Sequence, residues 1–226
     1  MQNAAGATEV ALFGLAAIAA AVYGVAFCRS ETPAGTVFKT ASVLLLAAFA
    51  GLWGAPDLLV LALALSSLGD FFLSRPGDRA FLAGMAAFLA AHLAYIAFFI
   101  PRAGPMLQSA ADGAALALML GFGGGIYRLI YPGLGAFKVP VAVYILAILG
   151  MGWFALHLDR HQIDGFAASL VMTGAGLFLL SDTVLGVQKF RLRAGTGADQ
   201  VASYLVWSTY WVAQALIAIS GGGLGR

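Results

Sequence analysis

Residues 61–74 read LALALSSLGDFFLS, an apolar run suited to the interior of a bilayer that nevertheless carries an aspartate, Asp70. Residues 173–186, TGAGLFLLSDTVLG, place a second aspartate, Asp182, in the same kind of surroundings. A carboxylate at membrane depth costs about 2.5–3.5 kcal/mol on insertion scales. Chains keep such a group when it is paired, faces a cavity or takes part in chemistry. Both aspartates are therefore candidate functional residues.

The composition of the whole chain is that of an integral membrane protein. Hydrophobic residues make up 62% of its 226 residues and charged residues 10%, whereas soluble domains average about 45–50% and about 25%. The one cysteine, Cys28, excludes an internal disulfide. Three scattered histidines predict no metal site, and no other cofactor is expected. A net charge of +2 gives no indication of nucleic-acid binding.

Eight segments approach the 20 or so apolar residues that a membrane-spanning helix needs. Turn residues or charges separate these segments, and every proline lies in or beside a break, so unbroken helices are expected. We predict an all-α polytopic membrane protein whose single domain, 1–226, is a bundle of eight transmembrane helices. The predicted spans are about 8–28, 37–54, 57–74, 80–100, 110–127, 137–156, 165–187 and 199–220.

The basic residues gather on alternate loops. Nine of the twelve lie in the first, third, fifth and seventh loops or at the adjoining span ends, and the other three are Arg102, Arg160 and Arg226. The positive-inside rule places the side with nine basic residues in the cytoplasm. With eight spans, both termini then lie on the non-cytoplasmic side.

Two further patterns bear on how the helices pack. LSSLGDFFL at 65–73 is similar to FLLSDTVL at 178–185, four spans later, which indicates either a parallel 4+4 repeat or chance similarity between apolar segments. Small residues let membrane helices approach closely, although 29 glycines also produce such steps by chance. The candidate positions are Gly121, Gly125, Gly174 and Gly176.

Asp70 and Asp182 lie at the same predicted depth. Each is four or five residues from the inner end of its span, which is roughly 6–8 Å inside the boundary at about 1.5 Å per residue. If the third and seventh helices are neighbours, both carboxylates face one cavity toward the cytoplasmic leaflet. A few polar groups in an apolar wall are typical of a small-molecule site. The polar candidates for this wall are Lys39, Ser66, Ser67, Ser74, His92, Tyr144, Ser203, Trp207, Tyr210 and Gln214.

Each candidate also has a purely structural interpretation. The aspartates would form ion pairs with Arg75 or Lys189, and His92 would bond to a neighbouring helix. The tyrosines and tryptophans would anchor the protein at the membrane interface, and Lys39 would snorkel to the surface. The basic cluster at 189–193 is better explained by topology than by phosphate binding.

Six motifs follow one another in the order found in a known family. They are SSLGDFFL (66–73), FLAGMAAFLAAHLAYIAFF (81–99), YPGLG (131–135), VPVAVY (139–144), LFLLSDTVL (177–185) and YWVAQALI (210–217). By these motifs the chain resembles the YhhN family, a lysoplasmalogenase-like group of membrane proteins. The resemblance covers nearly the whole chain, and its most specific parts are the residues around Asp70, His92 and Asp182.

The resemblance implies a hydrolase that cleaves the vinyl ether bond of lysoplasmalogens, lysophospholipids held among membrane lipids. Two carboxylates suit this reaction as they suit glycosidic bonds, one as a proton donor and one as a charged partner, so Asp70 and Asp182 are the expected catalytic pair. We expect the other polar side chains to position water or the glycerol hydroxyls, and the basic ones to meet the phosphate. The first group is His92, Tyr144, Tyr210 and Gln214; the second is Lys39, Arg75 or Arg79.

Two other functions stay open. In a proton-coupled transporter of lipids or small molecules, the two aspartates would form a proton relay. An intramembrane aspartyl protease also uses two aspartates, one of them in a G-x-G-D sequence. Residues 67–70 read SLGD and lack the first glycine, and the chain has no Pro-Ala-Leu motif.

Overall fold

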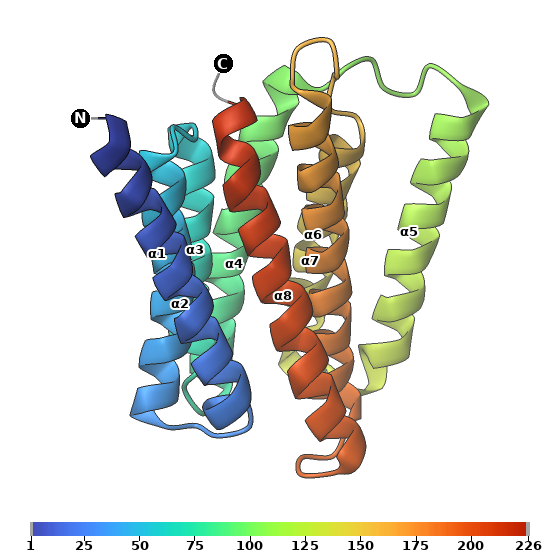
Figure 1. The fold of residues 1–226 in the computed structure, drawn as a ribbon. Coiled ribbons are helices and arrows are strands. Elements are labelled where there is room, and N and C mark those ends of the chain that lie inside the picture. The colour runs from blue at the N-terminus through green and yellow to red at the C-terminus, as the bar shows by residue number, and fades with distance from the viewer. Residues whose placement is uncertain (1, 225–226) are drawn as a thin grey trace.

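The computed structural model describes residues 2–224, which form an almost entirely helical bundle. Within these residues the only strand-like contact is one isolated bridge, Ala103–Leu158. The long helices are α1 Gln2–Val22, α2 Pro33–Leu52, α3 Asp57–Leu73, α4 Asp78–Phe99, α5 Ala110–Ile130, α6 Lys138–Leu156, α7 Gly165–Arg191 and α8 Gly197–Leu224. They run alternately up and down, so α1 begins and α8 finishes at the same end of the bundle (Figure 1). The predicted all-α fold is confirmed over these residues.

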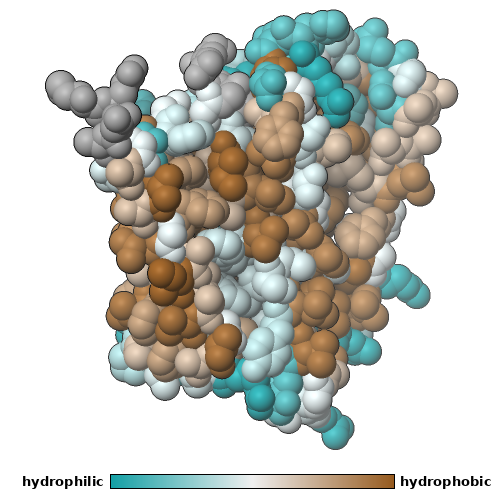
Figure 2. Space-filling view, in the orientation of Figure 1, coloured by the Kyte–Doolittle hydropathy of each residue, from teal (hydrophilic) through white to brown (hydrophobic). Residues whose placement is uncertain are grey.

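Seven helical segments of the described chain are long and apolar enough to cross a membrane. The exception is α3, whose 17 residues span about 25 Å, slightly less than the roughly 30 Å of a hydrocarbon core. Apolar side chains cover much of the flank of the molecule, and hydrophilic ones gather at its two ends (Figure 2). The protein is therefore a multi-pass integral membrane protein, with α3 as the shortest of its long helices.

Local sequence signals explain where several helices begin. The Thr32 side chain accepts a hydrogen bond from the backbone at the start of α2, and Pro33 occupies the first helical position. Ser109 and Asp112 form a reciprocal capping box at the start of α5. Asp164 caps α7 by accepting a hydrogen bond from the backbone of residue 167. These caps satisfy backbone donors that the helices themselves leave unpaired.

Close helix packing occurs at only some of the predicted small residues. A Cβ atom on Gly174 would lie 2.8 Å from a side-chain atom of Ile217, so α7 and α8 touch there as predicted, whereas Gly176 faces open space. The prediction is wrong for Gly121 and Gly125, which have no neighbour within 4 Å of such an atom. Both are exposed because α5 turns a different face toward α6. The 4+4 repeat stays a prediction.

Candidate active site

Asp70 on α3 and Asp182 on α7 line the same cavity, which has a volume of about 530 Å³. We call it the polar cavity. Residues of the α1–α2, α3–α4 and α7–α8 loops form its mouth, at the opposite end of the bundle from the start of α1. The two helices are not close packing partners, since α3 packs chiefly on α2 and α4, and α7 packs chiefly on α8 and α6. The two carboxylates therefore face one cavity although α3 and α7 are not the close neighbours that the sequence-based argument assumed.

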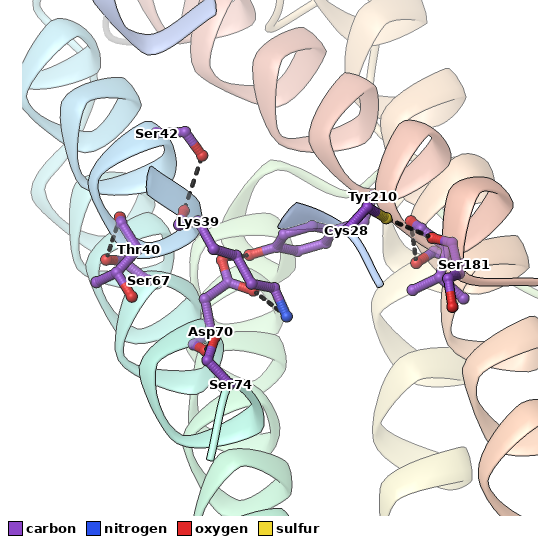
Figure 3. A network of polar contacts seen from close by, with 11 residues as sticks. Cys28, Lys39, Thr40, Ser42, Ser67, Asp70, Ser74, Ser181 and Tyr210 are labelled. Atoms are coloured by element: carbon purple, nitrogen blue, oxygen red, sulfur yellow. Dashed lines mark hydrogen bonds and ion pairs between the residues drawn. The ribbon is translucent and has the colours of Figure 1, made fainter. Parts of the chain in front are cut away.

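Asp70 is held by two polar partners from different helices. Its carboxylate accepts a hydrogen bond of 2.7 Å from the Tyr210 hydroxyl of α8 and forms an ion pair of 3.4 Å with the Lys39 ammonium of α2 (Figure 3). The Asp70 side chain is only 1% exposed. Its ionic partner is Lys39 and not Arg75, whose guanidinium lies 4.4 Å from the ring centroid of Phe71. The carboxylate of Asp70 is thus buried beside a cation.

Asp182 has neutral or titratable partners instead. Its carboxylate accepts a hydrogen bond of 2.5 Å from the Tyr144 hydroxyl of α6, and Nε2 of His92 lies 3.9 Å from the same oxygen. Neither ring nitrogen of the buried His92 has a hydrogen-bond partner among the described residues. Lys189 pairs with Asp78 at 3.6 Å and not with Asp182. Within residues 2–224, no lysine or arginine forms an ion pair with Asp182.

The serines near the two aspartates fix how neighbouring helices align. The Ser67 hydroxyl donates a hydrogen bond of 2.9 Å to the backbone carbonyl of Thr40 on α2, which sets Lys39 beside Asp70. The Ser181 hydroxyl donates one of 3.1 Å to the carbonyl of residue 206 on α8, one turn before Tyr210 (Figure 3). By contrast, Ser66 and Ser74 bond to carbonyls of their own helix. Of the predicted serines, Ser74 and Ser203 line the polar cavity and Ser66 does not.

Gly69, which precedes Asp70, allows α4 to approach α3. A Cβ atom at this position would lie 2.5 Å from the ring of Phe88, so only glycine leaves room for that ring. Phe88 packs edge-on against Phe178 and Tyr210, with ring centroids 6.1 and 5.6 Å away. Sequence reasoning missed Phe88 as a residue that shapes the site. The signal for it was the glycine beside an intramembrane aspartate.

Two of the predicted residues on α8 hold helices together. The buried Gln214 side chain accepts a hydrogen bond of 2.8 Å from the Tyr95 hydroxyl of α4, and the structure does not bring it to either carboxylate. The Trp207 ring nitrogen donates a hydrogen bond of 3.1 Å to a backbone carbonyl of α1. Tyr23, which sequence reasoning also missed, lines the polar cavity, and its ring centroid lies 5.9 Å from the Lys39 ammonium. Its position at the inner end of the first span, at the depth of Lys39, was the available signal.

Basic residues surround the mouth of the polar cavity. Arg29, Arg75 and Lys189 contribute to its lining together with the acidic Glu31 and Asp199. The described lining does not include Arg79, the other predicted phosphate contact. A mouth of mixed charge with an excess of cations is suited to a zwitterionic or anionic head group.

A second cavity, which we call the apolar slot, adjoins the polar cavity. It lies among α4, α5, α6 and α7, and its wall includes Met85, Ile126, Val141 and Ile145. Asp182 belongs to the lining of both cavities, whereas Asp70 lines only the polar one. Asp182 therefore marks the boundary between a polar and an apolar chamber.

The chemistry available at this site is proton transfer by two carboxylates. A buried aspartate within hydrogen-bond reach of a tyrosine is suited to donate or accept a proton, provided that a substrate atom comes close. Among residues 2–224, no group of three histidine, cysteine, aspartate or glutamate side chains lies close enough together to hold a metal ion.

The chain is similar to proteins of one known family. The model of the YhhN family matches residues 34–221. A lysoplasmalogenase of Mycobacterium bovis is 33% identical over 162 residues, 70% of this chain and 58% of that protein. Lysoplasmalogenase TMEM86A of Bos taurus is 33% identical over 70% of this chain and 62% of its own length. Lysoplasmalogenase TMEM86B of Homo sapiens is 35% identical over 80% and 73%.

The similarity covers only part of the length of these relatives. The chain spans about three-fifths of the length of the first two of these proteins, at 58% and 62%. No solved structure gives a significant match.

Proposed function

Since the chain belongs to the YhhN family, we propose that it is a membrane-embedded lysoplasmalogenase. Such an enzyme hydrolyses the vinyl ether bond of a lysoplasmalogen to a fatty aldehyde and a glycerophospho-base. Curated relatives with this name support the proposal at 31–35% identity. The observation that carries it is the pair of buried carboxylates, Asp70 and Asp182, in the lining of one cavity.

The proposed reaction consumes one water molecule. A proton is first transferred to C2′ of the chain, the carbon one bond beyond the ether carbon C1′, and this leaves an oxocarbenium ion at C1′ and the ether oxygen. Water then adds to C1′ and loses a proton, which gives a hemiacetal. Finally the bond between C1′ and the glycerol oxygen breaks. The glycerol oxygen takes up a proton, the hemiacetal hydroxyl gives one up, and the neutral aldehyde is released.

The surroundings of the two aspartates suggest different roles. Asp70 lies 3.4 Å from the Lys39 ammonium, so we assign it as the carboxylate that stabilises the cation and accepts a proton from water. Asp182 forms no ion pair with lysine or arginine in the described chain, so we assign it as the acid. Its place at the boundary of the apolar slot suits contact with C2′, the chain side of the ether.

The tyrosines would orient the reacting carboxylates. The Tyr144 hydroxyl bonds to one oxygen of Asp182 and the Tyr210 hydroxyl bonds to one oxygen of Asp70, whose other oxygen faces the Lys39 ammonium. His92, whose Nε2 atom lies 3.9 Å from Asp182, is in the lining of neither cavity, so it would act on the substrate only through this carboxylate.

We also propose that α3 crosses the membrane together with the seven longer helices, which gives eight spans, and that the polar cavity opens to the cytoplasm. A span of 17 residues is at the lower limit for a transmembrane helix. Arg29, Arg75 and Lys189 line the cavity near its mouth, and the positive-inside rule places this end in the cytoplasm. Both termini are then on the non-cytoplasmic side.

The test uses the purified chain in nanodiscs with a lysoplasmalogen, and mass spectrometry of the products. Asp70→Asn and Asp182→Asn should each lower the rate of aldehyde release by about 10²–10⁴-fold, the usual contribution of a general acid or base. Asp57→Asn is the matched control, because Asp57 is an exposed aspartate at the start of the same helix α3. Wild-type-like rates in both site variants would overturn the mechanism. Uptake of lipid into liposomes without product would favour a transporter.

A further inference from the structure

We infer that the apolar slot binds the alkenyl chain of the substrate while the polar cavity holds its glycerophospho head group. This inference rests on the proposed function and adds to it a place for each half of the lipid. It follows from how the two cavities meet, from the chemistry of their walls and from the loose packing of α5.

The two cavities share one wall. Leu73, Phe81, Phe88, Asp182 and Leu185 line both of them. A ligand that passes this wall would have one part among the charged residues of the mouth and the other among apolar side chains. A lysolipid has this division, with a charged head group at one end and one hydrocarbon chain at the other. The vinyl ether bond lies where the two halves join, which places it beside Asp182.

The wall of the apolar slot fits a hydrocarbon chain. Its members from α5 and α6 carry no polar side-chain group apart from the Tyr144 hydroxyl that bonds to Asp182. Such a wall offers a hydrocarbon chain surroundings as apolar as the lipid tails it leaves. The head group gains nothing from such a wall and would leave its charges without partners there. The orientation of the lipid is therefore set by chemistry as well as by shape.

The wall formed by α5 is the one suited to move. Only Gly123 and Ile130 are buried along this helix, and several of its apolar side chains face outward. The slot encloses about 70 Å³, far less than the roughly 300–1,000 Å³ of pockets that hold drug-sized ligands. A chain can enter only if this wall shifts. Because α5 has the fewest buried residues of the helices around the slot, its movement breaks the fewest contacts.

Two valines of α6 give a matched test. Val141 lines the slot, whereas Val143, two residues further on, is 47% exposed on the outer surface. The comparison measures kcat/KM for lysoplasmalogens with a long and with a short alkenyl chain. Val141→Phe should lower the ratio of the long-chain to the short-chain value at least tenfold, since even one methylene in an apolar pocket changes discrimination by about 10–200-fold. Val143→Phe should leave this ratio at the wild-type value.

A second measurement does not depend on turnover or on the folding of a variant. A lysolipid with a saturated alkyl ether has no vinyl group to hydrolyse, and a diazirine near the end of its chain marks its neighbours on irradiation. Labelling of α5 and α6 peptides that contain Ile126 or Ile145 would support the inference. Labelling confined to α1 and α2, or equal chain-length ratios in both valine variants while wild-type hydrolysis persists, would overturn it. Absence of hydrolysis by the wild type would instead refute the proposed function.

Discussion

Gly69→Ala should lower both the stability of the protein and its activity without removing any polar group from the site. The added Cβ atom would lie 2.5 Å from the Phe88 ring, about 0.9 Å closer than the 3.4 Å at which ordinary contact begins. Phe88 cannot swing aside freely, because Phe178 and Tyr210 pack against its ring. Overpacking of this kind costs about 1–3 kcal/mol in the free energy of unfolding. Since Tyr210 donates to Asp70, the shift should also lower the rate of aldehyde release.

The assay is the thermal unfolding midpoint in detergent, measured together with the rate of aldehyde release. Gly176→Ala is the control, because a Cβ atom on Gly176 of α7 would have no neighbour within 4 Å. In a helix, alanine is more favourable than glycine by roughly 0.5–1 kcal/mol, so the control should be unchanged or slightly more stable. Equal midpoints for Gly69→Ala and Gly176→Ala would refute the argument that Gly69 is required for close packing of α3 and α4.

Two further predictions concern a hydrogen bond in the site and a charge far from it. Tyr144→Phe removes the donor to Asp182, whose carboxylate becomes charged as it gives up its proton. Since a hydrogen bond to a charged group contributes about 1.5–3 kcal/mol, the rate of aldehyde release should fall roughly 10–100-fold, whereas Tyr204→Phe at an exposed position should have no effect. In the α6–α7 loop, hydrogen bonds from the His161 backbone and the Gln162 side chain lower the pKa of Asp159 below its usual value of 3.8. Its stabilising effect is therefore present above the unfolded pKa and lost as the pH falls through the lower folded pKa, so Asp159→Asn should lower the unfolding midpoint at pH 7 but not at pH values below the folded pKa. A constant difference across this range would contradict the assignment.

The helices could be predicted because membrane spans leave a strong signal in sequence. Each of the eight predicted segments overlaps one long helix, and charged or turn-forming stretches such as residues 75–79 separate them. The residue depths follow from the same counting, which is why Lys39 could be named as a candidate for the wall around Asp70. That pair is now seen at 3.4 Å.

The neighbour that each side of a helix contacts could not be predicted. Gly121 and Gly125 have the spacing of a packing motif but face outward, because nothing in their own helix says where α6 lies. Gln214 has the spacing of a site residue relative to Tyr210, yet its partner is Tyr95. The sides of an apolar helix differ too little in polarity to show which side contacts lipid and which contacts a neighbouring helix. The rotation of each helix therefore depends on contacts with partners far away in sequence.

The likeness between the two aspartate motifs has a local physical cause. In LSSLGD the Ser67 hydroxyl bonds to a carbonyl of α2, and in FLLSD the Ser181 hydroxyl bonds to a carbonyl of α8. In each case a serine fixes the helix against its neighbour, and an aspartate one to three residues later lines the polar cavity. A hydroxyl donor and a carboxylate at close spacing are what such an arrangement requires, whatever the history of the chain. Two helices under the same requirement would come to resemble each other without a duplication of four spans, so the similarity supports a shared task for Asp70 and Asp182 more directly than it supports a repeat.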